Sequence, residues 1–222
     1  SVESIAQGST GTKTFYAQWT LITYTITYEG LNGADNPNTA TSYTVESETI
    51  TLQNPTRTGY TFDGWSEEGS SRISPDVTIP IGSEGNRKYT AHYTPITYSL
   101  SYTMNNGSND VNNPVSYDIE SSDIVLNAPT RLGYDFTGWK YDSTKSLDVT
   151  IPKGSTGYKY FEAEWVLVIY SVDYNLNGGT VAQANIANYD VTSEDFSLNN
   201  PTKRATRSQD GQAPIYQGGL LA

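Results

Sequence analysis

The sequence predicts a mostly β protein in which small domains are repeated in tandem. Three observations predict it: motifs that recur at a fixed spacing, short segments that alternate apolar and polar residues, and a composition in which Leu, Ile and Val are scarce and tyrosine is abundant. Apolar residues make up only 36% of the 222 residues, against roughly 45–50% in ordinary globular domains. The eighteen tyrosines and four tryptophans can instead close several small cores, because each aromatic ring buries about 150–250 Å².

The repeat is carried by motifs that recur with offsets of 74 and 72 residues. The strand-like motif Tyr-x-x-x-Tyr begins at Tyr24, Tyr98 and Tyr170. The same offsets separate three Pro-Thr pairs and three Ala-x-aromatic motifs, which begin at Pro55, Pro129 and Pro201 and at Ala17, Ala91 and Ala163. A period of this length exceeds the roughly 20–50 residues of a solenoid unit and is long enough for a small self-contained domain.

The register of these motifs divides the chain into five segments. Residues 1–19 match the end of a repeat, residues 24–93 and 98–165 are complete repeats, and residues 170–203 begin a further one. Residues 204–222 match nothing, although the pattern demands Gly-Tyr-x-Phe-x-Gly-Trp there. For this tail a truncation scar or a shifted reading frame is favoured over a change of domain.

Each repeat is predicted to begin with a half-buried strand. In residues 24–28 the side chains of Tyr24, Ile26 and Tyr28 alternate with threonines, which is the period-two pattern of a strand with one buried face. The Asn-Gly pairs that follow, at residues 32–33, 106–107 and 177–178, favour a tight hairpin turn because both central residues adopt positive φ there. A second strand is expected through residues 41–45.

The middle of each repeat is predicted to form a turn that leads into a strand. An acidic residue follows within two positions of Ser47, Ser121 and Ser193, and each of these serines permits at most one short helical turn. The β-branched residues around them favour a strand instead. A Pro-Thr pair then ends the segment, since proline cannot donate to a central ladder.

The second half of each repeat is predicted to supply the aromatic core. Tyr60 and Phe62 fall on one face of a strand, and Gly64 allows a bulge that re-aims Trp65. A final strand is expected at residues 88–93. The predicted core residues occupy matched positions in the copies: Tyr60, Phe62, Trp65, Tyr134, Phe136, Trp139, Trp19, Tyr93 and Trp165.

The connections between repeats predict an elongated, stiff rod. Residues 94–97 and 166–169 are short and contain proline or β-branched residues in place of glycine and serine. Such connections leave neighbouring domains little freedom, in contrast to Gly/Ser linkers.

Charge and composition exclude several kinds of partner. Thirteen basic and twenty-four acidic residues give a net charge of −11, which repels the phosphate backbone of nucleic acids and an anionic bilayer. No apolar run approaches the roughly 18 residues of a membrane span. No secretion signal opens the chain, and we expect the signal and the anchor to lie outside this segment. The absence of cysteine excludes a disulfide framework and thiolate metal sites. We expect a monomer that neither binds nucleic acid nor inserts this segment into a membrane.

No residue pattern predicts catalysis, a cofactor or a metal site. The single histidine, His92, occupies a position held by Gln18 and Glu164 in the other copies, as expected of a solvent-facing strand position. The acidic pair at 67–68 has no counterpart in the next copy, where Tyr141-Asp142 falls, so no fixed acid/base pair recurs. Residues 109–113 offer oxygen ligands for calcium, although a polar hairpin loop is the favoured interpretation. The chain is predicted not to be an enzyme.

The motifs taken in order resemble the Listeria–Bacteroides repeat, which is akin to the internalin B-repeat. The resemblance rests on Leu-Asn-Gly-Gly at residues 176–179, Asn-Pro-Thr-Arg-x-Gly-Tyr-x-Phe-x-Gly-Trp, Ile-Pro-x-Gly-Ser-x-Gly and Ala-x-Trp, and covers about residues 1–203. The departures are Ala34 and Ser108 at the second glycine of the first motif and Tyr93 in the last. The resemblance implies a β-grasp-like fold, secretion, attachment to a bacterial cell surface, and a role in adhesion or as a stalk.

Two functions follow, of which the first is favoured. The repeats form a spacer that holds a distal domain away from the cell wall. Alternatively, each repeat binds a host surface protein or glycan weakly and the array gains avidity by repetition. Tyr43, Tyr117 and Tyr189 occupy matched positions and are the candidate ligand contacts of that alternative, although a place in the core is favoured for them.

Overall fold

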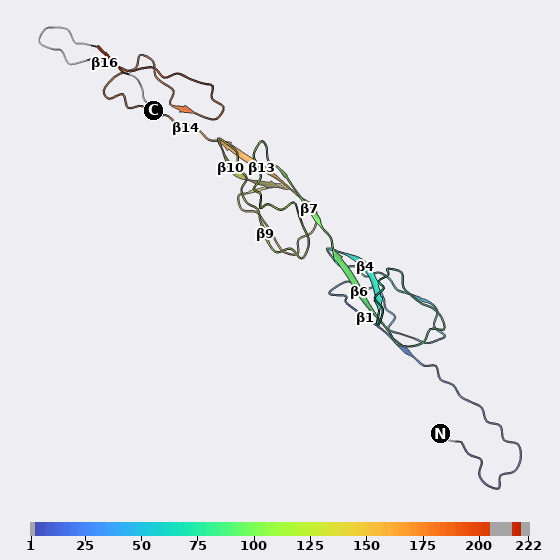
Figure 1. Cartoon of the computed structure of the whole chain (residues 1–222). Coiled ribbons are helices and arrows are strands. Elements are labelled where there is room, and N and C mark those ends of the chain that lie inside the picture. Colours follow the sequence, from blue (N-terminus) through green and yellow to red (C-terminus); the bar gives the residue numbers. More distant parts are fainter. Residues whose placement is uncertain (1–2, 205–214, 219–222) are drawn as a thin grey trace, which may run out of the picture. The chain divides into compact units, whose positions relative to one another are not determined.

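A computed structural model of the chain describes residues 3–204 and 215–218. The chain divides into two compact units, Ser1–Ile96 and Thr97–Ala222. Strands are the only regular elements among the described residues (Figure 1), so the predicted mostly β class is confirmed. None of the described segments forms a helix long and apolar enough to cross a bilayer.

The first unit is built on a mixed four-stranded sheet. Its strands are β1 (Tyr24–Glu29), β2 (Ser42–Tyr43), β3 (Ile50–Thr51), β4 (Tyr60–Glu67), β5 (Thr78–Ile79) and β6 (Arg87–Pro95). The sheet order is β2-β1-β6-β4, and β3 pairs with β5 beside it. The first strand, β1, runs parallel to the last, β6, whereas β2 and β4 are antiparallel to their neighbours.

The second unit repeats this arrangement. Its complete repeat contains β7 (Tyr98–Thr103), β8 (Ser116–Tyr117), β9 (Ile124–Val125), β10 (Tyr134–Tyr141), β11 (Thr144–Ser146), β12 (Thr150–Ile151) and β13 (Lys159–Leu167). The sheet order β11-β10-β13-β7-β8 adds only β11 to the order of the first unit. The remaining strands form two-stranded pairs, β14 (Tyr170–Ser171) with β15 (Asn188–Tyr189) and β16 (Thr202–Arg204) with β17 (Ile215–Gln217).

The predicted tight turns are present, with a shift in the second repeat. Asn32 and Gly33 adopt φ of 46° and 82°, and Asn177 and Gly178 adopt 48° and 80°. In the second repeat the turn lies at residues 105–106 instead of 106–107, with positive φ at Asn105 and Asn106 and a hydrogen bond from the Gly107 nitrogen to the Met104 carbonyl. None of these turns forms a tight hairpin between paired strands, and the expected second strand at 41–45 is reduced to β2.

The predicted bulge is confirmed in both repeats. The register between β4 and β6 shifts between Phe62 and Gly64, and the register between β10 and β13 shifts between Phe136 and Gly138. The extra residue turns the next side chain inward, and Trp65 is only 1% exposed as a result.

Each unit has its own hydrophobic core. The buried residues are Ile26, Tyr43, Leu52, Trp65, Ile79, Tyr89 and Ala91 in the first, and Leu100, Tyr117, Leu126, Trp139, Ile151, Phe161 and Ala163 in the second. Of the predicted core residues, Trp65 and Trp139 are buried, whereas Tyr60, Phe62, Tyr93, Tyr134, Phe136 and Trp165 are half-buried.

The prediction that Trp19 belongs to a core is wrong. Its side chain is 91% exposed, because the described residues before β1 form no strand and offer it no sheet to pack on. The final strand of each repeat is longer than predicted, since β6 reaches Pro95 and β13 reaches Leu167. Only Ile96 and Thr97 therefore connect β6 to β7.

Candidate functional site

The tyrosines predicted as ligand contacts lie in two different environments. Tyr43 and Tyr117 are 4% and 5% exposed, and their hydroxyls donate to the backbone carbonyls of Gly85 and Gly157 at 2.5 and 2.6 Å. These two lie in the core, which is the placement favoured for them above over ligand contact, and a ligand cannot reach a ring face that the sheet covers. Tyr189 is 41% exposed.

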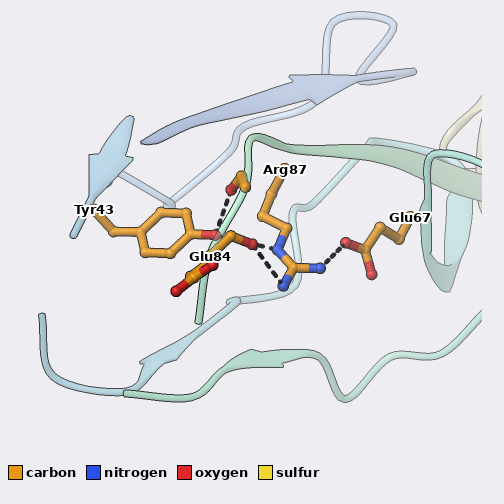
Figure 2. Close-up of polar contacts among 5 residues, drawn as sticks. Tyr43, Glu67, Glu84 and Arg87 are labelled. Carbon is orange, nitrogen blue, oxygen red and sulfur yellow. Dashed lines mark hydrogen bonds and ion pairs between the residues drawn. The ribbon is translucent and has the colours of Figure 1, made fainter. Parts of the chain in front are cut away.

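In the first repeat, Tyr43 belongs to a polar network centred on Arg87 (Figure 2). Arg87 stands at the start of β6, and its Nη1 forms an ion pair with Glu67 at the end of β4. Its Nε donates to the hydroxyl of Tyr43 at 3.3 Å, and its Nη2 donates to the backbone carbonyl of Glu84 at 3.4 Å. The hydrogen bonds to Glu67 and Tyr43 raise the pKa of Arg87 further above its ordinary value. The network fixes the position of the Glu67 carboxylate.

Glu67 forms part of the wall of a hollow of about 280 Å³ in the first repeat. The lining comes from β4, the connection to β5, β5 itself and β6: Trp65, Glu67, Ser70, Arg72, Ser74, Asp76, Val77, Thr78 and Tyr89. Trp65 and Tyr89 are 1% and 2% exposed, and burial raises the pKa of Tyr89 to about 12. The accessible wall is therefore mostly hydroxyl, carboxylate and guanidinium.

The second repeat fills the same place with an aromatic ring. Tyr141 stands where Glu67 stands in the first repeat, and its ring lies 5.0 Å from that of Phe161, which replaces Tyr89. Lys159 replaces Arg87, and its Nζ lies 3.4 Å from the hydroxyl of Tyr141. A contact between two aromatic rings in the second repeat thus takes the place of the ion pair in the first. The difference between Glu67 and Tyr141 is visible in the sequence, but the sequence does not show that the two side chains take the same place beside β6 and β13.

A pair of hydrogen bonds between an asparagine side chain and the backbone recurs in three copies of the repeat and was not predicted from the sequence. The side-chain amide of an asparagine mimics a strand by bonding both backbone groups of one residue some 14 or 15 positions later: Asn38 with Gln53, Asn113 with Asn127, and Asn185 with Asn199. Asn113 is only 6% exposed. A single asparagine in a polar loop carries no periodicity, so only the comparison of copies could have revealed it.

The residues considered for calcium and for catalysis make ordinary local contacts. The Asp110 Oδ1 accepts from the backbone and side-chain nitrogens of Asn112 at 2.8 and 2.9 Å. In the part of the chain that the structure describes, no three His, Cys, Asp or Glu side chains gather in a way that could hold a metal ion. The Nε2 of His92 lies 2.7 Å from the hydroxyl oxygen of Ser66.

Comparison with known proteins identifies the repeats. The model of the Listeria-Bacteroides repeat domain matches residues 24–91 and 98–158, so the predicted resemblance is confirmed. A protein of Evansella cellulosilytica named "Putative Gly-rich membrane protein" is 30% identical over 186 residues, which cover 80% of this chain and 21% of that protein. A "Putative membrane protein" of the same organism is 25% identical over 181 residues, covering 81% of this chain and 26% of its own length. No solved structure matches.

Proposed function

The chain belongs to the Listeria-Bacteroides repeat domain family, and from that membership we propose that it is a non-catalytic stalk segment of an extracellular bacterial surface protein. The family is a repeat type of surface proteins, and the names of both relatives describe membrane proteins. Because the chain spans about a quarter or less of each relative, the stalk role is proposed for these repeats alone. The repeats are monomeric and extracellular in this proposal, and the strongly acidic composition favours solubility there.

The observation that carries the proposal is the pairing of the first strand of each repeat with its last. β1 lies parallel to β6 over four residue pairs, from Ile26↔Arg87 to Glu29↔Thr90. The corresponding strands β7 and β13 are paired in the same way over four residue pairs. The two strands at which the chain enters and leaves the repeat are thus direct neighbours.

This pairing suits a segment under tension. A pull on the two ends of the repeat draws β1 toward its amino end and β6 toward its carboxyl end. In a parallel pair the hydrogen bonds are evenly spaced along the strands, so such a pull loads all of them together in shear. A stalk that transmits force between an anchor and a distal domain needs this resistance. The parallel terminal strands also support the β-grasp-like fold that the family resemblance implies.

The junctions support stiffness within the stalk. The two-residue connection after β6 begins with Ile96, whose backbone nitrogen donates to the Gly59 carbonyl at 2.9 Å. After β13, the nitrogen of Val168 donates in the same way to Gly133 at 3.0 Å. Each connection is thus tied to the repeat that it leaves, which leaves few freely rotating bonds, and we propose an elongated rod.

Small-angle X-ray scattering of the whole chain tests the rod. A compact protein of this length has a radius of gyration of about 17 Å. The proposal predicts a value about twice that, with a pair-distance distribution skewed toward long distances, while circular dichroism shows a folded β protein. A radius near 17 Å in folded protein contradicts the rod.

A further inference from the structure

We propose that the hollow of the first repeat, lined by Glu67, Arg72, Asp76 and Thr78 over a floor of Trp65 and Tyr89, binds a single neutral sugar ring. Its volume of about 280 Å³ is just below the roughly 300–1,000 Å³ of small-molecule sites. The hollow therefore suits one small ligand. The site is additional to the stalk role, since that role rests on the backbone pairing of β1 with β6, whereas the site rests on side chains that line the hollow.

The hollow is not a requirement of the fold. In the second repeat the Tyr141 ring packs on Phe161 at the same place, and that repeat forms the same sheet order. The first repeat substitutes Glu67 for this ring and uses a connection between β4 and β5 that is two residues longer than the one between β10 and β12. The exchange of the half-buried Tyr141 ring for a carboxylate gives up packing of the kind that this ring makes on Phe161 and leaves polar groups around an open hollow, a change that the binding of a ligand would explain.

The polar groups around the hollow include both hydrogen-bond donors and hydrogen-bond acceptors, and a hydroxylated ligand needs both. The Glu67 carboxylate is held in place by Arg87 and keeps a second oxygen that can accept. Within the described ranges, neither the guanidinium of Arg72 nor the carboxylate of Asp76 has a hydrogen-bond or ion-pair partner. Arg72 can donate to ring or hydroxyl oxygens, and Asp76 can accept from hydroxyls.

The charges around the hollow select a neutral ligand. An anion would meet the carboxylates of Glu67 and Asp76, and a cation would meet the guanidinium of Arg72. Arg87 lies outside the lining and already balances the charge of Glu67. Apart from Val77 and the covered rings of the floor, the lining is polar, so an apolar ligand would leave charged groups unpaired at considerable cost. A neutral ligand with several hydroxyls pairs with both signs of charge at once, and a sugar ring is such a ligand.

Nuclear magnetic resonance of the ¹⁵N-labelled whole chain tests the site. The probes are the methyl glycosides of glucose, mannose and N-acetylglucosamine, each added up to about 50 mM, since single-ring binding is expected in the millimolar range. We expect saturable shifts of the Trp65 indole N–H and of the amides of residues 67–78 with at least one probe. The Trp139 indole N–H, at the same place in the second repeat, should not move.

Matched variants separate binding from folding. Asp76→Asn and Arg72→Gln should each weaken binding about tenfold or more, a loss of roughly 1.4 kcal/mol. Asp148→Asn changes the equivalent acid of the second repeat, whose backbone nitrogen bonds a serine just as that of Asp76 does, and should change nothing. Glu67→Tyr combined with Arg87→Lys copies the second repeat, so the fold should survive while binding is lost.

Two outcomes overturn the proposal. The first is the absence of a saturable shift with all three sugars. The second is a shift that persists in Asp76→Asn and in the variant that copies the second repeat. Either result leaves the stalk role untouched, because force transmission is measured separately.

Discussion

Replacing Gly64 by alanine should destabilise the first repeat severely. Gly64 adopts φ of +143° at the bulge, and an added Cβ would lie 2.6 Å from the backbone carbon of Ser74 and 2.8 Å from its oxygen. That backbone cannot retreat, because it is bridged to Trp65 by two hydrogen bonds of 2.9 and 3.0 Å. Backbone strain costs about 1–3 kcal/mol and overpacking a further 1–3 kcal/mol, a loss of roughly 2–6 kcal/mol from a small domain that has little to spare.

The matched control is Gly69→Ala, which isolates the backbone contribution. Gly69 has φ of +80° with no atom within 4 Å of an added Cβ, so it should cost only about 1–2 kcal/mol. Urea unfolding is followed by the indole N–H resonances of Trp65 and Trp139, one in each complete repeat. Gly64→Ala should lower the midpoint of the Trp65 signal by roughly 1 M or more and leave the Trp139 signal in place. Equal losses in the two glycine variants would refute the argument from close packing.

Three further predictions concern the core. Tyr43→Phe removes a hydroxyl that donates to a backbone carbonyl and accepts from an arginine, and should cost the first repeat about 1–2 kcal/mol in urea unfolding; no loss would mean that the network is incidental. Asn113→Ala removes the side-chain partner of both the backbone N–H and the backbone carbonyl of Asn127, and should cost the second repeat about 2–4 kcal/mol in the same assay. A loss below that range would contradict the structural role of the Asn113 amide. Burial raises the pKa of both Tyr89 and Tyr102 to about 12 from 10 in the unfolded chain, so the folded state retains their protons longer. Stability should be full below pH 10 and decline as pH rises from 10 to 12, and unchanged stability over that range would contradict the burial of these hydroxyls.

Local pattern was enough to locate the elements that have strong periodicity. The alternation of Tyr24, Ile26 and Tyr28 predicted β1, and the Gly-Trp pair at 64–65 predicted a bulge that places an indole in the core. Both predictions succeed because the deciding physics lies within five or six residues of chain: the side-chain period of a strand and the conformational freedom of glycine.

The remaining features depend on contacts between distant residues. The alternation of apolar and polar residues within β1 and β6 predicts two strands, but it does not predict that the two pair with each other or that they run parallel. Tyr43 stands in a strand of two residues, too short for a pattern, and it is buried because the sheet brings it to Gly85. Trp19 is the opposite case, a residue with a clear motif that is not buried. Its motif matches that of Trp165, but a tryptophan at this position is buried only where the other strands of the sheet are present to cover it.

Single-molecule force spectroscopy tests the stalk role most directly. The chain is pulled by its two ends, and each complete repeat should unfold in its own force peak, releasing about 70 residues and thus about 240 Å of chain at roughly 3.5 Å per residue, less the length of the folded repeat. Because the chain has no cysteine, Tyr60→Cys with Pro95→Cys provides unique handles at the paired ends of β4 and β6. Pulling there should peel the strands apart at a much lower force. Equal unfolding forces when the chain is pulled by its ends and by the two cysteines, or extension of the chain without peaks, would contradict the proposal that the paired terminal strands resist the force.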